Sequence, residues 1–182
     1  MLRRRRLVPP LLAALALAAL ALFVSACGYS SDSKDVAEGE VVKLGDLKYQ
    51  VVFSRFLNPN DSEDSAYLVG QPPPEKGSTY FGVFLEVQNK SEETQKLADS
   101  FTITDAEEQL FEAIPSESLY AFPVGGEVES QEPIPTPGST PQQGAIEGSL
   151  VLFELPASAS ENRPLTLSIP GPDGPAEVKL DL

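Results

Sequence analysis

Residues 79–89 (TYFGVFLEVQN) constrain the fold of this 182-residue chain more than any other segment. Apolar side chains recur at every second position, at Phe81, Val83, Leu85 and Val87. Because successive side chains of a strand point to opposite faces, this spacing predicts a β-strand with a buried face. The polar residues 89–93 (NKSEE) predict a turn directly after it.

Other segments have the same character. Residues 47–53 alternate, and residues 145–155 (AIEGSLVLFEL) predict a second strong strand that ends at Pro156. Shorter strands are expected at 67–69, 101–104, 110–114, 165–169 and 178–182, one helical turn at 116–120, and turns at 105–108 and 170–174. Short strands without a long helix predict an all-β, immunoglobulin-like β-sandwich of about seven to nine strands, in a single domain at 46–182.

The first 26 residues have the three parts of an export signal. Arg3-Arg4-Arg5-Arg6 is the basic start, an apolar run follows, and Ser25-Ala26 is a small-residue cleavage site. Between Pro10 and Val24 the apolar run has 14 residues. A bilayer core needs about 20, so a cleaved signal peptide is favoured over a permanent transmembrane helix. The paired arginines leave two export routes open, the general one and the twin-arginine one.

The apolar run ends at Val24-Ser25-Ala26-Cys27, and Cys27 is the only cysteine in the chain. This pattern resembles the lipobox of bacterial lipoproteins. The resemblance implies that the sulfur of Cys27 carries a diacylglyceryl group and that cleavage makes Cys27 the mature N-terminus. It also implies an extracytoplasmic protein that is lipid-anchored to the outer face of the bacterial cell membrane. Residues 27–45, which begin with small, polar and acidic side chains, are expected to form a flexible tether.

The charge of the chain limits its partners. It has 13 basic and 27 acidic residues, and four of the arginines precede Cys27. The mature chain therefore has nine basic against 27 acidic groups, a formal charge of −18. This charge repels nucleic acid and anionic headgroups alike. Membrane attachment must then come from the lipid, and two acyl chains form a stable anchor.

Missing residue types limit the chemistry. The chain has no histidine or tryptophan, and its only methionine is Met1. Without histidine there is no imidazole base to activate a serine or cysteine, and with Cys27 acylated there are no soft metal ligands. The acidic turn at 58–64 (NPNDSED) lacks the spacing and glycine of a calcium loop, so a solvated turn is favoured. We expect no catalytic residue, no metal site and no cofactor.

Alternation also predicts which side chains lie on each face of the sheets. The expected inward set is Tyr49, Val51, Phe53, Phe81, Val83, Leu85, Val87, Val151, Phe153 and Leu155. The opposite face then carries five further apolar side chains, namely Val52, Tyr80, Phe84, Leu150 and Leu152. Residues 41–44 or 119–122 are expected to cover them. The alternative is a docking surface for an envelope protein, since large exposed apolar patches mark interaction sites.

The proline-rich segment 126–144 is expected to form a stiff surface loop, with docking of a proline-recognising partner as the alternative.

Residues 80–83 with 87–91, then 101–105, then 148–156, resemble in their order the telokin-like domain of unknown function found in bacterial lipoproteins. That family is similar in fold to a secreted mycobacterial immunoprotective antigen, an immunoglobulin-like sandwich. The resemblance covers roughly residues 45–182 and implies no catalytic residues. A non-catalytic, lipid-anchored binding module of the bacterial envelope is therefore expected. The alternative is an exported enzyme that works with carboxylates alone, or a transport-accessory protein.

Overall fold

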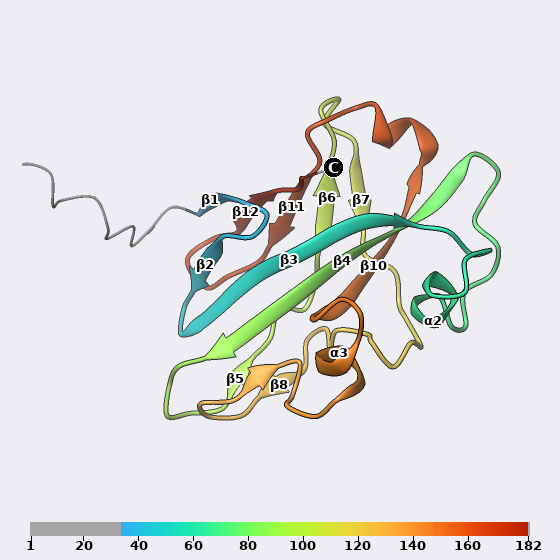
Figure 1. Cartoon of the computed structure of the whole chain (residues 1–182). Coiled ribbons are helices and arrows are strands. Elements are labelled where there is room, and N and C mark those ends of the chain that lie inside the picture. The colour runs from blue at the N-terminus through green and yellow to red at the C-terminus, as the bar shows by residue number, and fades with distance from the viewer. Residues whose placement is uncertain (1–33, 182) are drawn as a thin grey trace, which may run out of the picture. The chain divides into compact units, whose positions relative to one another are not determined.

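The computed structural model describes residues 34–181. Its regular elements are mostly strands (Figure 1). The strands are β1 (Asp35–Ala37), β2 (Val41–Leu44), β3 (Leu47–Leu57), β4 (Ser78–Asn89), β5 (Gln95–Lys96), β6 (Thr102–Thr104), β7 (Leu110–Glu112), β8 (Glu127–Val128), β9 (Pro133–Ile134), β10 (Ser149–Pro156), β11 (Thr166–Ile169) and β12 (Ala176–Lys179). The helical elements are α2 (Asp64–Tyr67), α3 (Thr140–Gln143) and a 3₁₀ turn at Ala157–Ser160. None of these described helices has the length and apolar character that crossing a bilayer requires.

Two main sheets form a sandwich. One has the strand order β1-β12-β11-β6-β7, and the other has the order β10-β4-β3-β2, with β9 also paired to β4. β5 and β8 form a separate two-stranded ribbon. The predicted all-β sandwich is therefore confirmed, although with more strands than the seven to nine expected. Most of the additional strands have only two or three residues, too few to show an alternating pattern in the sequence.

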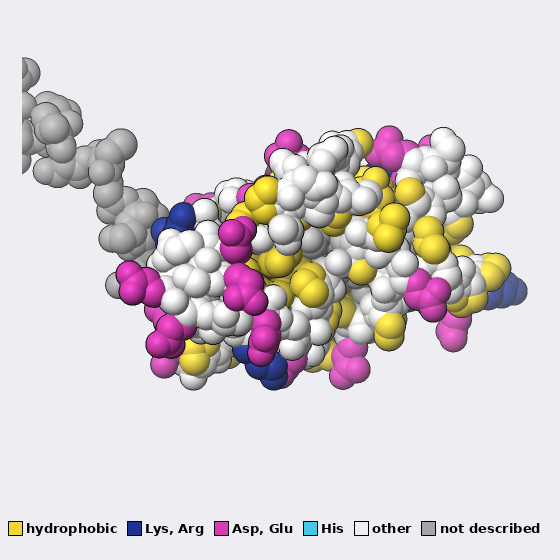
Figure 2. All heavy atoms as spheres, turned by 90° about the horizontal axis from the view of Figure 1, so that it is seen from below, with side chains coloured by type: hydrophobic (Ala, Val, Ile, Leu, Met, Phe, Trp, Pro, Cys, Tyr) yellow, Lys and Arg dark blue, Asp and Glu magenta, His cyan; other side chains and the backbone are white. Residues whose placement is uncertain are grey.

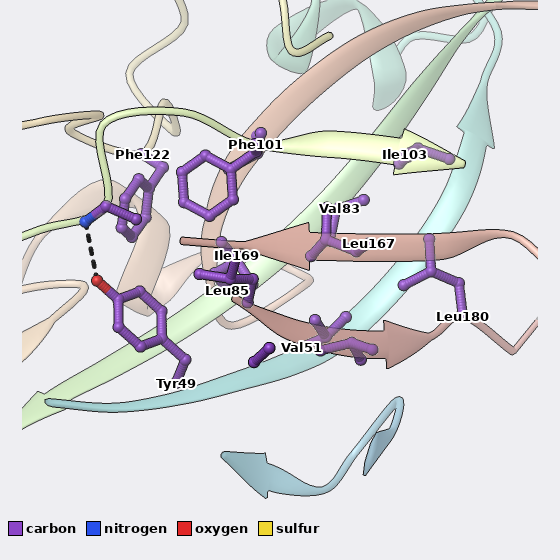
Figure 3. Packing of buried hydrophobic residues seen from close by; sticks show 14 of the residues in the cluster. Tyr49, Val51, Val83, Leu85, Phe101, Ile103, Phe122, Leu167, Ile169 and Leu180 are labelled. Atoms are coloured by element: carbon purple, nitrogen blue, oxygen red, sulfur yellow. Dashed lines mark hydrogen bonds between the residues drawn. The ribbon is translucent and has the colours of Figure 1, made fainter. Parts of the chain in front are cut away.

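The main core lies between the two sheets. β4 contributes Phe81, Val83 and Leu85, which are fully buried. Leu167 and Ile169 of β11 face Val83 and Leu85 from the other sheet (Figure 3). From β10, the buried side chains of Val151, Phe153 and Leu155 join the same cluster. Nine of the ten predicted inward side chains are therefore buried in this core.

The exception is Phe53, whose side chain is 42% exposed. A β-bulge lies between Val51 and Phe53, because Val51 pairs with Leu85 while Phe53 pairs with the very next residue, Phe84. Val52 is therefore the extra residue. Because the side-chain period of a strand is two, one extra residue moves the following side chains to the opposite face. The inward assignment of Phe53 was wrong for this reason.

Beyond the bulge the inner and outer faces of β3 are exchanged relative to simple alternation. Phe56 now points to the core, where its ring contacts that of Phe81 with centroids 4.9 Å apart. Leu57, which pairs with Tyr80, lies on the outer face and is 1% exposed.

The outer face of β4 and β10 holds a second apolar cluster. Tyr80, Phe84, Leu150 and Leu152 are at most 1% exposed and pack with Leu57, Tyr67 and Leu68. Gly82 allows this close packing, since a Cβ there would lie 2.9 Å from Leu150 Cδ1. Cover within the chain is thus confirmed, and these four side chains form no exposed docking surface. Val52, the fifth of the set, is half-buried.

Two loops provide most of the cover. One is residues 58–77, between β3 and β4, and the other is residues 113–126, between β7 and β8. Tyr67 of α2 packs edge-on against Phe84 and Tyr120, with ring centroids 5.1 Å and 4.8 Å away. The two loops are joined by the hydroxyl of Ser118, which donates to the Ala66 carbonyl at 2.8 Å. Residues 41–44 do not take part, because Val42 and Leu44 belong to the main core. The short strand expected at 67–69 and the helical turn expected at 116–120 do not form.

The segment assigned to a tether is folded from Asp35 onward. β1 pairs in parallel with β12, and Val36 is 6% exposed. The carboxylate of Glu38 then accepts hydrogen bonds from Ser54 and from the Asp181 amide. The tether boundary at residue 45 was therefore too late, because these strands are too short to show a periodic pattern.

Truncating the core phenylalanines tests the face assignment on both sides of the bulge. Phe81→Ala and Phe153→Ala should each lower the free energy of unfolding by about 3–5 kcal/mol, because each leaves a cavity. Phe53→Ala is the matched control and should cost less than about 1 kcal/mol, since its ring is partly solvated. Urea denaturation measures all three, and a Phe53→Ala cost equal to that of Phe81→Ala would contradict the bulge.

Phe84→Ser tests the covered outer face. It removes a ring from the second cluster and buries a hydroxyl that has no hydrogen-bond partner there. We therefore expect the free energy of unfolding to fall by several kcal/mol. Thermal unfolding measures the effect. An unchanged melting temperature would show that the loops carrying Tyr67 and Tyr120 do not cover Phe84 in solution.

Candidate functional site

The outer face of the β3–β4 pair has an open half beside the covered one. Lys48 pairs across the strands with Gln88, and Gln50 pairs with Glu86. All four side chains are exposed or half-buried. They lie before the bulge on β3 and after Leu85 on β4, outside the apolar cluster that contains Tyr67 of α2.

A pocket of about 480 Å³ lies over this open half. Its base comes from β3 and β4, and its walls come from β2 and from residues 133–147, which we call the arm. The lining residues are Val41, Lys48, Tyr49, Gln50, Glu86, Val87, Gln88, Pro133, Ile134, Pro135, Pro137, Gln142 and Glu147. The pocket therefore combines apolar walls with polar side chains from several segments.

The arm contains the prolines that indicated a surface loop. It is packed rather than projecting, because Pro135 and Pro141 are buried. It begins as β9, where Ile134 pairs with Val87 of β4, and it carries α3. At its end the Gly148 amide donates to the Pro141 carbonyl. Gly148 has a φ of 143°, and a Cβ there would lie 3.1 Å from that of Phe84.

Asn89 anchors the base of the arm to the end of β4. It is fully buried, and its side-chain amide donates to the carbonyls of Val128 and Glu129 at 3.2 and 3.0 Å. Its side-chain oxygen accepts from the amide and hydroxyl of Ser91. Its backbone amide donates to the Glu132 carbonyl at 3.1 Å. Asn89 therefore supplies hydrogen-bond partners to several backbone groups of residues 128–132, which directly precede the arm.

Tyr49 separates the pocket from the core. Its side chain is 2% exposed, and its phenol oxygen accepts a hydrogen bond from the Ala98 amide at 2.9 Å (Figure 3). Burial raises the pKa of the Tyr49 phenol above its ordinary value, and the bond from Ala98 lowers it by less. The phenol is therefore neutral at physiological pH and has a structural role.

The charged side chains of the pocket have no partners within the described residues. Glu86, Glu147 and Lys48 make no hydrogen bond or ion pair there. The face in Figure 2 shows many acidic side chains and few basic ones. The pocket thus has two free carboxylates and one free ammonium on an acidic protein.

The acidic turn at 58–64 is exposed over residues 58–63, as expected, and only Asp64 is buried. Asp64 is 3% exposed and forms an ion pair with Arg55. It also accepts a hydrogen bond from the Asn58 amide at 2.7 Å. Asp64 therefore closes the turn. Within residues 34–181, no group of three or more metal-ligating side chains could hold a metal ion.

Cys27, the predicted lipidation site, lies outside the described residues. Sequence reasoning missed the pocket, because the base comes from polar strand positions and the walls come from a segment with no periodic pattern. The proline content of the arm was the one feature that pointed to this segment.

No protein-family model matches the chain, and no curated protein sequence matches it. Solved structures do match. An uncharacterised β-sandwich protein from Clostridium difficile is 13% identical, with a TM-score of 0.50 over 82% of this chain and 95% of that one. The YjhA protein from Bacillus subtilis is 16% identical, with a TM-score of 0.54 over 80% of this chain and 99% of that one. At these identities the likeness shows the β-sandwich fold alone.

Replacing Asn89 tests how the arm is held. Asn89→Ala leaves the carbonyls of Glu93, Val128 and Glu129 without their side-chain donor, and we expect a cost of about 1–3 kcal/mol. Hydrogen exchange should also accelerate at residues 127–134. Gln88→Ala, at the exposed neighbouring position, is the control and should change neither. Unchanged exchange in Asn89→Ala would contradict the anchoring role.

Proposed function

We propose that this chain is a lipid-anchored, extracytoplasmic protein of the bacterial cell envelope, and that its β-sandwich is a non-catalytic binding module. The observation that carries the proposal is the sequence Val24-Ser25-Ala26-Cys27 at the end of an apolar run that follows four arginines. Such a run ends the signal peptide of an exported chain. A diacylglyceryl group on Cys27 then supplies the two acyl chains of a stable anchor.

The position of β1 supports close attachment to the membrane. Six residues, 28–33, lie between Cys27 and Lys34, where the described domain begins. A chain of this length spans at most about 25 Å. The domain would therefore stay near the lipid surface, and its acidic character would keep it from binding anionic headgroups directly.

Two observations support a binding role over a catalytic one. The buried carboxylates of Asp64 and Asp105 are occupied by structural hydrogen bonds, to the Asn58 amide in one case and to the Glu107 and Gln109 amides in the other. Neither lines the pocket. The chain also lacks the histidine that most hydrolytic triads require.

Membership of the telokin-like family of lipoprotein domains is part of the same proposal. It is supported by the order of the segments at 80–91, 101–105 and 148–156, which form β4, β6 and β10 in the sandwich.

Intact mass tests the anchor directly. Protein extracted from bacterial membranes should lack residues 1–26 and carry an added diacylglycerol on Cys27. Cys27→Ser should either leave the precursor uncleaved or release the protein from the membrane fraction. Ala26→Gly is the matched control, because glycine is also small, and it should leave processing intact.

The result that would overturn the anchor is a mature protein that retains Ala26 or has an unmodified Cys27 thiol. Mass and membrane fractionation would show either outcome without knowledge of a ligand.

A further inference from the structure

We propose that the pocket between the β3–β4 face and the arm binds an aliphatic amine that carries two or more ammonium groups. This inference rests on the proposed binding function and names the class of ligand. The arguments come from the shape of the pocket, from its charges and from its apolar walls.

The shape fits a small molecule. Small-ligand pockets usually have volumes of roughly 300–1,000 Å³ and combine apolar walls with a few polar groups. The volume of about 480 Å³ lies in this range. The base is held by strand pairing. The arm is held at its start by the pairing of β9 with β4, and it leads directly into β10 at its end. The hydrogen bond from the Gly148 amide to the Pro141 carbonyl closes its second half. The site is therefore largely formed before a ligand binds.

The charges favour a cation with more than one charged group. Glu86 comes from the base on β4, and Glu147 comes from the end of the arm. Neither carboxylate has a partner within residues 34–181, so both are available to a ligand. An ammonium group forms strong, charge-assisted hydrogen bonds with a carboxylate. Two carboxylates, one on the base and one on the arm, match two ammonium groups better than one.

Lys48 opposes this charge only in part. It pairs with Gln88 and lies diagonally across the strands from Glu86, without an ion pair to it. Diagonal neighbours on adjacent strands are about 7–8 Å apart. The two carboxylates still outnumber the single ammonium, and the surrounding domain repels anions.

The apolar lining favours methylene groups between the charges. Val41, 45% exposed, lies on one wall, and Pro133, Ile134 and Pro137 lie on the arm. The lining has one aromatic residue, Tyr49, whose ring is buried in the core. An aromatic ligand or a sugar would therefore find no stacking surface, whereas an aliphatic chain can pack against valine and proline side chains.

Binding of spermidine to the full chain, purified in a non-ionic detergent, tests the proposal by isothermal titration calorimetry at low salt. Glu86→Gln and Glu147→Gln should each weaken binding about tenfold, the loss expected for a charge-assisted hydrogen bond. Lys48→Gln should leave the affinity equal or raise it. Glu112→Gln on β7 changes the net charge equally, lies outside the pocket lining, and should change the affinity less than about twofold.

Three results would overturn the proposal. They are no detectable binding of spermidine, equal weakening by Glu112→Gln and Glu86→Gln, and loss of binding in Lys48→Gln alone. The second would indicate general charge attraction, and the third would indicate an anion site.

Intact mass of the same preparation separates the two proposals. If the protein is lipidated but does not bind spermidine, only the proposal of an amine site is overturned. If the protein is not lipidated but binds spermidine, only the proposal of a lipid anchor is overturned.

Discussion

The pairing of β3 with β4 is the interaction on which the rest of this structure depends. These strands are the longest in the described chain, and both of their faces are used. The inner face packs against the second sheet, while part of the outer face is buried under two loops. Because no disulfide can brace residues 34–181, which contain no cysteine, the apolar contacts of this pair must stabilise the domain.

The bulge at Val52 determines how the two faces are used. It moves Phe53 outward and brings Phe56 into the core, where it meets Phe81. A bulge also increases the local twist of a strand pair. On the far side of the bulge the outer face is apolar and covered at Tyr80 and Phe84 of β4, while Phe53 of β3 stays partly exposed. Before the bulge the outer face is polar and open. The pocket lies over the open part.

This division explains why the domain has a pocket although its core is filled. The loops that carry Tyr67 and Tyr120, together with Ile146 of the arm, cover the apolar half of the outer face. The rest of the arm borders the polar half. Glu86 and Gln88 on β4 therefore remain accessible beside the proline side chains of the arm. The acidic excess of the whole chain, with two glutamates and one lysine in the pocket lining, favours cations over anions there.

The sequence by itself determined the sandwich class, the core positions of β4 and β10, and the absence of imidazole and thiol chemistry from residues 34–181. These follow from local alternation and from residue types, which do not depend on distant contacts. Only the tertiary structure decided the face of Phe53, the cover over Phe84, the folding of residues 35–44 and the pocket under the arm. A bulge is defined by its partner strand, and strands of two or three residues have no period of their own. Such features exist only once segments far apart in the chain pack together.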